Sequence, residues 1–223
     1  MKGYARLWVP LVWYGIACFC MAWIDPSELG LYFMMGWNVL LSVLPLTAVL
    51  GCERAQRAGK TGTVLFLGLF WFLFFPNSVY MPTDMLHLSG EVFYTDNGPY
   101  APVTFVRDIV LWLRLMLIAG GLWMSLMLGM ESLRRAAALV CGRFGKAAEI
   151  AFTAGTGIAA GYGVYIGRFL RLNSWDVLRP VWLMRTVLQG SNRFALLFSA
   201  GYGSFVLLCY LIYRLVLSSA NKG

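Results

Sequence analysis

Six long apolar segments constrain this chain more than any other feature of its sequence. They cover residues 7–24, 29–51, 63–80, 109–130, 147–167 and 194–217. A helix needs about 20 apolar residues to cross the hydrocarbon core of a bilayer, and each segment approaches or exceeds that length. The first follows basic residues, as a signal peptide does, but residues 21–25 lack the small-residue pattern of a cleavage site. We therefore predict an all-α polytopic membrane protein with six transmembrane helices.

The composition excludes both a soluble globular domain and a disordered chain. Hydrophobic residues make up 60% of the sequence and charged residues 13%, whereas about a quarter of an ordinary soluble domain is charged. The formal net charge of +8 would favour nucleic-acid binding in a soluble protein, but in a membrane protein we expect no nucleic-acid partner. The five cysteines show no metal-ligand spacing, and we expect all five to be small, buried apolar residues.

The distribution of charge predicts how the chain is oriented. If the N-terminus is cytoplasmic, 11 basic and three acidic residues lie on the cytoplasmic side, against seven arginines and seven acids outside. Cytoplasmic loops normally carry such an excess of Lys and Arg. We therefore expect both termini in the cytoplasm and one transmembrane domain, residues 1–223.

Small residues recur at four-residue intervals in two of the predicted spans. They are Gly121, Ser125 and Gly129 in one span, and Gly155, Ala159, Gly163 and Gly167 in the next. Ridges of small residues allow transmembrane helices to approach closely. We predict that these two helices cross there, which is a packing feature and not a site of chemistry.

The last outer loop is unusually rich in arginine. It contains Arg168, Arg171, Arg179, Arg185 and Arg193. We expect Arg168 and Arg171 to continue the preceding helix and share one face, and Asn173 or Ser174 to end it and cap the next. Arginine binds phosphate and carboxylate groups through paired hydrogen bonds. The loop is therefore either an anion site or a set of interfacial arginines paired with Asp176 and the acids of the other outer loop.

A short helix is expected within this loop at residues 181–189. Pro180 suits its first turn and Gly190 its end. Because it is too short to span the bilayer, it should be an interfacial or re-entrant helix.

The other long outer loop, residues 81–108, begins with a motif that holds the only histidine of the chain. Asp84 and His87 are three residues apart and face one direction on a helical turn. Imidazole changes charge near neutral pH, and Asp84 would orient it for acid–base work. Two other interpretations stay open: a divalent-ion site formed with Asp176, and a purely structural pair. The spacing matches no standard metal signature, so we assign no metal ligands.

Both polar motifs should lie on the outer side, because successive spans alternate in direction. The candidate catalytic residues are Asp84, His87 and Asp176. The candidate anion-binding residues are Arg168, Arg171 and Asn173. The candidate supporting residues are Asn38, Asn77, Tyr80 and Trp175. Asn38 belongs to them because a polar residue in an apolar span usually faces the bundle interior. We expect the two motifs to converge on one outward-facing pocket.

Four stretches of the sequence carry a resemblance to a known family. They are Trp37-Asn38 with Pro45, Phe75-Pro76-Asn77 through Tyr80, Thr83-Asp84 to His87-Leu88, and Gly167-Arg168-Phe169-Leu170-Arg171 through Asn173-Ser174-Trp175-Asp176. With these motifs the chain resembles domain of unknown function family 1361 (DUF1361). The resemblance implies a multispan protein of the bacterial cytoplasmic (inner) membrane, and it implies no activity.

Three functions remain open from the sequence. The first is an outward-facing site that binds or processes a phosphate-bearing lipid or a lipid-linked substrate. The second is a small transporter, alone or as a dimer, with Asn38, Asp108 and Arg114 along its path. The third is a structural or assembly subunit of a membrane complex. Membrane lipids and a second copy of the chain are the expected partners, and the sequence identifies no cofactor.

Overall fold

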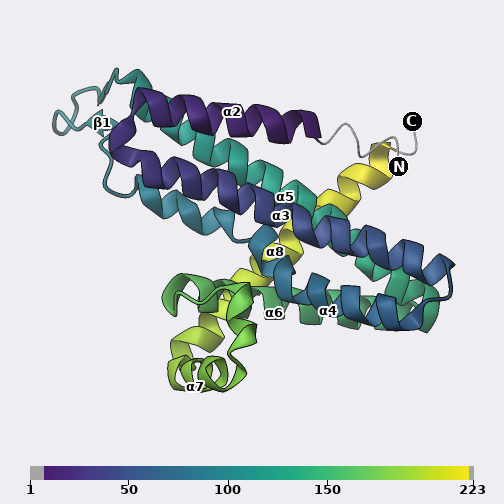
Figure 1. The fold of residues 1–223 in the computed structure, drawn as a ribbon. Helices are drawn as coiled ribbons and strands as arrows, with labels where there is room; N and C mark the ends of the chain where they lie inside the picture. The colour runs from purple at the N-terminus through teal and green to yellow at the C-terminus, as the bar shows by residue number, and fades with distance from the viewer. Residues whose placement is uncertain (1–7, 221–223) are drawn as a thin grey trace. The chain divides into compact units, whose positions relative to one another are not determined.

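The structure is a computed structural model in which residues 8–220 are described (Figure 1). Its α-helices are α2 (Trp8–Ile24), α3 (Leu29–Arg57), α4 (Thr61–Ser78), α5 (Ile109–Phe144), α6 (Lys146–Phe169), α7 (Pro180–Gly190) and α8 (Arg193–Ala220). Short 3-10 helices are η1 (Pro26–Glu28), η2 (Met81–Leu88) and η3 (Ser174–Leu178). Strands β1 (Tyr94–Thr95) and β2 (Thr104–Phe105) form an antiparallel pair with Tyr94 opposite Phe105. The predicted all-α class is confirmed.

Five helical stretches in the described residues are long and apolar enough to cross a membrane. They are Pro26–Arg57, Thr61–Leu88, Ile109–Phe144, Lys146–Phe169 and Arg193–Ala220. The remaining apolar helix, α2, has 17 residues, which is near the lower limit of about 17 for a span. Leu7, the first residue of that predicted segment, lies outside the described residues. The chain therefore has a polytopic membrane fold, and the count of six spans stays a prediction.

The chain divides into two compact units, which we describe one at a time. Unit 1 comprises Met1–Leu40 and Met81–Met124, and unit 2 comprises Leu41–Tyr80 and Ser125–Gly223. The single transmembrane domain expected for residues 1–223 stays a prediction.

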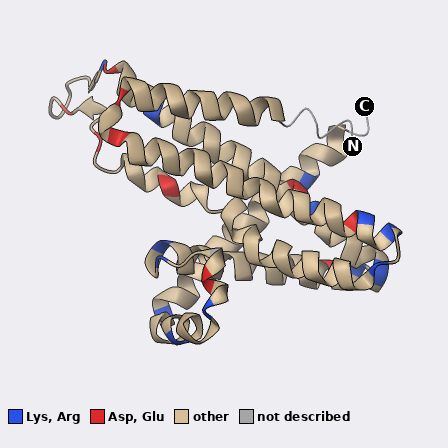
Figure 2. Cartoon of the chain, viewed as in Figure 1, with Lys and Arg blue, Asp and Glu red and all other residues tan. Residues whose placement is uncertain are grey.

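Charged residues avoid the middle of most helices and gather at their ends (Figure 2). Lys and Arg residues cluster where α3 ends and α4 begins, and again along and beside α7. Apolar side chains dominate the exposed surface between these ends, among them Trp13, Phe19 and Phe66, each more than 65% exposed. A water-facing surface would not carry so many large apolar side chains, so these helix faces are suited to lipid.

The prediction that all five cysteines are buried holds only in part. Cys18 and Cys52 are buried as predicted, and Cys141 and Cys209 are half-buried. The prediction was wrong for Cys20, which is exposed. An exposed position on an apolar helix meets lipid, so a small apolar residue is stable there without burial in protein.

The core of unit 1 lies where α2 meets α3, η2 and the first half of α5. Tyr14 of α2 is buried there, and its hydroxyl donates to the Leu117 carbonyl at 3.1 Å. Gly121 makes room for this tyrosine, because a Cβ atom at Gly121 would lie 2.2 Å from the Tyr14 hydroxyl oxygen. Gly121 therefore serves the packing of α2 and η2.

The closest approach of helices in unit 2 joins α6 and α8. A Cβ atom at Gly161 would lie 2.4 Å from the Ser199 carbonyl oxygen, and one at Gly203 would lie 2.9 Å from the Gly157 carbonyl oxygen. The backbones of the two helices therefore touch along Gly157, Gly161 and Gly203, and any added side-chain atom would separate them.

The predicted crossing of the helices at 109–130 and 147–167 is wrong. Gly129 of α5 packs on Ser78, and Gly163 of α6 packs on Pro76 of α4. A Cβ atom added at Gly155 would have no neighbour within 4 Å among the described residues. Small residues lie on more than one face of α6, and sequence spacing alone cannot select the face that receives the partner helix.

Replacing Gly161 with Ala should destabilise the protein by about 1–3 kcal/mol, since the methyl group has no space against the α8 backbone. Thermal unfolding in detergent measures the effect. Gly155→Ala is the matched control on the same helix, because open space surrounds that position. Equal melting temperatures for the two variants would contradict the close contact of α6 with α8.

Candidate functional site

Asp84 is the most deeply buried acid of the described residues. It lies on η2 with an exposed fraction of 0%, and its carboxylate accepts a hydrogen bond from the Asn38 side-chain amide at 3.0 Å. A buried carboxylate requires hydrogen-bond donors to offset its lost hydration. The structure thus brings together the candidate catalytic Asp84 and the candidate supporting Asn38, both within unit 1.

His87 lies one turn further along η2 and differs from Asp84 in its surroundings. Its side chain is exposed, and within residues 8–220 no hydrogen bond joins it to Asp84. The described residues also contain no group of three or more His, Cys, Asp or Glu side chains placed to hold a metal ion. The catalytic roles of Asp84 and His87 stay predictions.

Arg114 forms the main ionic cluster of unit 1. Its guanidinium binds Asp25 at 2.5 Å and also pairs with Glu91, while the Tyr32 hydroxyl donates to Asp25 at 2.6 Å. The Arg114 side chain is only 12% exposed. A cation at this depth in a membrane helix needs such partners. The sequence singled out Arg114 but not Asp25 or Glu91, because both acids come from other segments of the chain.

Hydrogen bonds from Ser27 and Tyr32, together with Arg114, lower the pKa of Asp25 to about 2. Asp25 follows the last residue of α2, outside the helices that could span the membrane. It is therefore ionised over the whole physiological pH range, which suits an anchor for a cation.

The outer arginine motif begins at the end of α6 in unit 2. The Arg168 guanidinium stacks over the Tyr80 ring, 4.7 Å from its centre, which is a favourable cation–π geometry. Gly167 permits this approach, because a Cβ atom there would lie 3.1 Å from the same ring. Tyr80, predicted as a supporting residue, therefore positions Arg168.

Arg171 does not continue α6, and the prediction that it shares a helix face with Arg168 is wrong. The helix ends at Phe169, and Arg171 has a left-handed backbone with φ of 55°. This conformation lets the Leu172 N–H return to the Ile166 carbonyl at 3.3 Å. A non-glycine residue at this φ is uncommon, so spacing arguments that assume a regular helix fail here.

Asn173 and Asp176 form a capping box at the start of η3. The Asn173 N–H donates to the Asp176 carboxylate at 2.7 Å, an arrangement that satisfies free backbone donors at a helix start. The prediction that Asn173 caps the next helix is confirmed.

Two other predicted supporting residues lie elsewhere in unit 2. Trp175 of η3 is 43% exposed. The Asn77 side-chain amide, near the end of α4, donates to the Phe74 carbonyl at 3.1 Å.

Helix α7 confirms the short helix predicted within this loop. Its C-terminal end is attached to α6, since the Tyr165 hydroxyl donates to the Gly190 carbonyl at 2.7 Å and Tyr162 hydrogen-bonds Ser191 at 2.6 Å. None of its side chains is buried. Val181, Met184 and Leu188 are 71%, 62% and 68% exposed, and their spacing places them on one face of the helix.

Four arginines surround this helix without acidic partners. They are Arg171, Arg179, Arg185 and Arg193, and all four are exposed. Among the residues that the structure describes, none of the four forms an ion pair. Asp176, the nearest acid in sequence, accepts from Asn173 instead. Asp84 and His87 belong to unit 1 and the arginines to unit 2, so a pocket shared by the two motifs stays a prediction.

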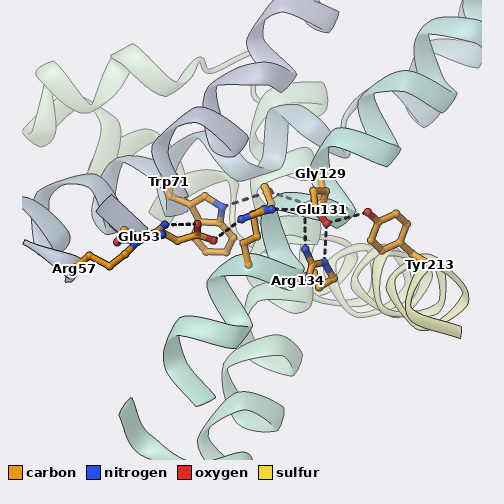
Figure 3. A network of polar contacts seen from close by, with 9 residues as sticks. Glu53, Arg57, Trp71, Gly129, Glu131, Arg134 and Tyr213 are labelled. Atoms are coloured by element: carbon orange, nitrogen blue, oxygen red, sulfur yellow. Dashed lines mark hydrogen bonds and ion pairs between the residues drawn. The ribbon is translucent and has the colours of Figure 1, made fainter. Parts of the chain in front are cut away.

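A second polar network, which the sequence analysis missed, is built around Glu131 of α5 (Figure 3). Arg134 binds the Glu131 carboxylate through two nitrogens at 2.7 and 2.8 Å, Arg135 binds it at 2.7 Å, and the Tyr213 hydroxyl donates to it at 3.0 Å. Arg135 also binds Glu53 of α3 at 2.7 Å. The network thus joins α3, α5 and α8 of unit 2. The spacing of Glu131 to Arg134 and Arg135 was visible in the sequence, but the partners on other helices were not.

The comparisons with known proteins agree with the resemblance drawn from the motifs. Residues 37–209 match a family model described as "Protein of unknown function (DUF1361)". Neither a curated protein nor a solved structure matches the chain.

Replacing Asp25 with Asn should lower the melting temperature near neutral pH, because Arg114 and Tyr32 lose their anionic partner. The pKa of Asp25 is about 2 when folded and 3.8 ordinarily, so its stabilising contribution is complete above about pH 4 and is lost as the pH falls towards 2. Melting temperatures of the two proteins should therefore converge between pH 4 and 2. Asp96→Asn, in an exposed loop, is the control. A gap that does not change with pH would contradict the assignment.

Replacing Glu131 with Gln should destabilise the protein by about 3 kcal/mol, because two arginines lose a shared, largely buried carboxylate. Unfolding in detergent measures the loss. Arg57→Gln is the control, since this side chain is 75% exposed and should contribute less than about 1 kcal/mol. Similar effects of the two substitutions would refute a central role for Glu131.

Proposed function

The chain belongs to the DUF1361 family, whose description names no activity, and from its own residues we propose that it binds an anionic, phosphate-bearing lipid at the outer face of the membrane. The proposal includes a bacterial inner-membrane location with both termini in the cytoplasm. That orientation is supported by the excess of Lys and Arg in alternate loops. With this orientation, the proposal assigns the arginine-rich loop and α7 to the outer leaflet.

The observation that carries the proposal is the set of exposed arginines around α7. Arg171, Arg179, Arg185 and Arg193 have no acidic partner within residues 8–220. Exposed arginines that no acid neutralises keep their hydrogen-bond donors available for an exogenous anion. Phosphate suits them, because the guanidinium group makes two parallel hydrogen bonds to its oxygens.

The apolar face of α7 favours a lipid over a soluble anion. Val181, Met184 and Leu188 are exposed on one face, and Arg185 lies beside that face on the helical wheel. A helix with this pattern lies in the membrane interface with its apolar face in the acyl boundary and its cations at phosphate level. The acyl chains of an anionic lipid would therefore contact the apolar face of α7, and its phosphate would contact the arginines of the same helix.

Binding is the function that the side chains support best. The Asp176 carboxylate, the acid nearest to these arginines in sequence, accepts a hydrogen bond from the Asn173 backbone and serves as part of a helix cap. Asp84 is buried and accepts one from Asn38. We therefore propose a lipid-binding protein without assigning a chemical step.

The test is lipid retention by the purified protein in nanodiscs or detergent, measured by native mass spectrometry with phosphatidylglycerol and phosphatidylcholine. Arg179→Gln combined with Arg185→Gln should weaken phosphatidylglycerol binding roughly thirtyfold, because each arginine near the lipid surface contributes about 1 kcal/mol. Phosphatidylcholine binding should change little.

Arg107→Gln is the matched control, since Arg107 is an exposed arginine of the other predicted outer loop and lies outside α7. It should retain wild-type affinity. Unchanged phosphatidylglycerol binding by the double variant, or an equal loss in the control, would overturn the proposal.

A further inference from the structure

A cavity of about 520 Å³ lies between the start of α6 and the last turns of α8, within unit 2. Lys146, Glu149 and Arg214 are its charged lining residues. It is separate from the arginine loop, because Lys146 begins α6 and Arg168 lies near its end. At 1.5 Å per residue, these positions are roughly 33 Å apart along the helix, about the thickness of the hydrocarbon core of a bilayer.

The Tyr210 hydroxyl is the first sign that the cavity accepts a ligand. Tyr210 lines the cavity and is only 5% exposed. In the described part of the chain, its hydroxyl oxygen is the one buried side-chain N or O atom without a hydrogen bond of normal geometry, and its nearest charged neighbour is Arg214, whose guanidinium lies 6.0 Å from the centre of the Tyr210 ring. A buried polar group that has lost its water and gained no partner is unfavourable, so native proteins rarely keep one without a purpose.

The charge of the cavity is the second sign. Glu149 binds the Lys146 ammonium at 2.7 Å and the Arg214 guanidinium at 2.8 Å, so two cations share one carboxylate and a positive charge remains. The Lys146 and Arg214 side chains are 62% and 45% exposed, which leaves further donors of both available. The N-terminus of α6 adds a partial positive charge at the same place.

Most of the remaining wall of the cavity is apolar, apart from Thr153 and Ser218, and it indicates the kind of ligand. Ile150 of α6 and Leu207, Leu211 and Leu215 of α8 line it, and in a membrane this wall continues the lipid-facing surfaces of the two helices. A free phosphate compound would leave it unused, whereas an acyl chain would cover it.

We propose that this cavity binds one anionic phospholipid, separate from the lipid bound at α7. Lys146 and Arg214 hold its phosphate, the Tyr210 hydroxyl donates to a phosphate or glycerol oxygen, and an acyl chain lies along Ile150 and Leu211. By the predicted orientation, this lipid belongs to the cytoplasmic leaflet.

The experiment measures lipid binding in a protein that already carries Arg179→Gln and Arg185→Gln, so that loss of the outer site does not affect the result. Phosphatidylglycerol, phosphatidylcholine and soluble glycerol phosphate are compared by native mass spectrometry and by the rise in melting temperature that each produces. We expect binding of phosphatidylglycerol only. Equal binding of glycerol phosphate would overturn the assignment to a lipid.

Two substitutions in this background test the residues. Tyr210→Phe removes one oxygen atom and keeps the aromatic ring beside Arg214, and it should weaken phosphatidylglycerol binding about fivefold, while the melting temperature of the lipid-free protein should change little because the hydroxyl makes no hydrogen bond of normal geometry. Arg214→Gln should also weaken binding about fivefold. Lys60→Gln, at an exposed position between α3 and α4, is the control. Unchanged affinity in Tyr210→Phe and Arg214→Gln would refute the site.

Discussion

Every acid that the sequence assigns to the basic side of the protein is shared between cations, and unit 2 depends on this sharing. Glu53 binds Arg57 and Arg135, Glu131 binds Arg134 and Arg135, and Glu149 binds Lys146 and Arg214. Charges near lipid must be paired or hydrated. Glu53 and Glu149 each join separate helices through their cations, whereas both cations of Glu131 lie on its own helix. The excess of positive charge on which the predicted orientation rests remains.

Unit 1 has the opposite ratio of acids to cations in its main ionic cluster. There a single cation, Arg114, lies between two acids, Asp25 and Glu91, and Tyr32 completes the cluster. Asp84 is fully buried and accepts a hydrogen bond from the Asn38 amide, which ties η2 to α3. Polar groups in this unit therefore serve first to hold its segments together, which is why we place the lipid-binding function in the arginine loop instead.

The sequence was sufficient for features that depend on local chemistry. Long apolar runs predicted the spanning helices, Pro180 and Gly190 predicted the limits of α7, and Asn173 predicted a cap. It failed where the outcome depends on distant segments. Gly155 and Gly161 look alike in sequence, and only the position of α8 makes Gly161 the contact residue. Arg171 was misassigned because its left-handed backbone is fixed by the turn into η3. The cavity at Tyr210 could not be predicted, since it exists only between two helices.

The attachment of α7 has a mechanical consequence. Tyr162 and Tyr165 hold its C-terminal end to α6, whereas its N-terminal end, at Pro180, follows the exposed Arg179. The 11-residue helix is roughly 16 Å long, and the two tyrosine hydrogen bonds hold only one of its ends to α6. Arg179, whose N–H donates to the Asp176 carbonyl of η3 at 2.9 Å, is therefore held by the short helix before it, whereas Arg193 follows the end that is attached to α6. Under the lipid-binding proposal, this difference in attachment lets the arginines at the two ends of α7 meet lipid phosphates at different depths.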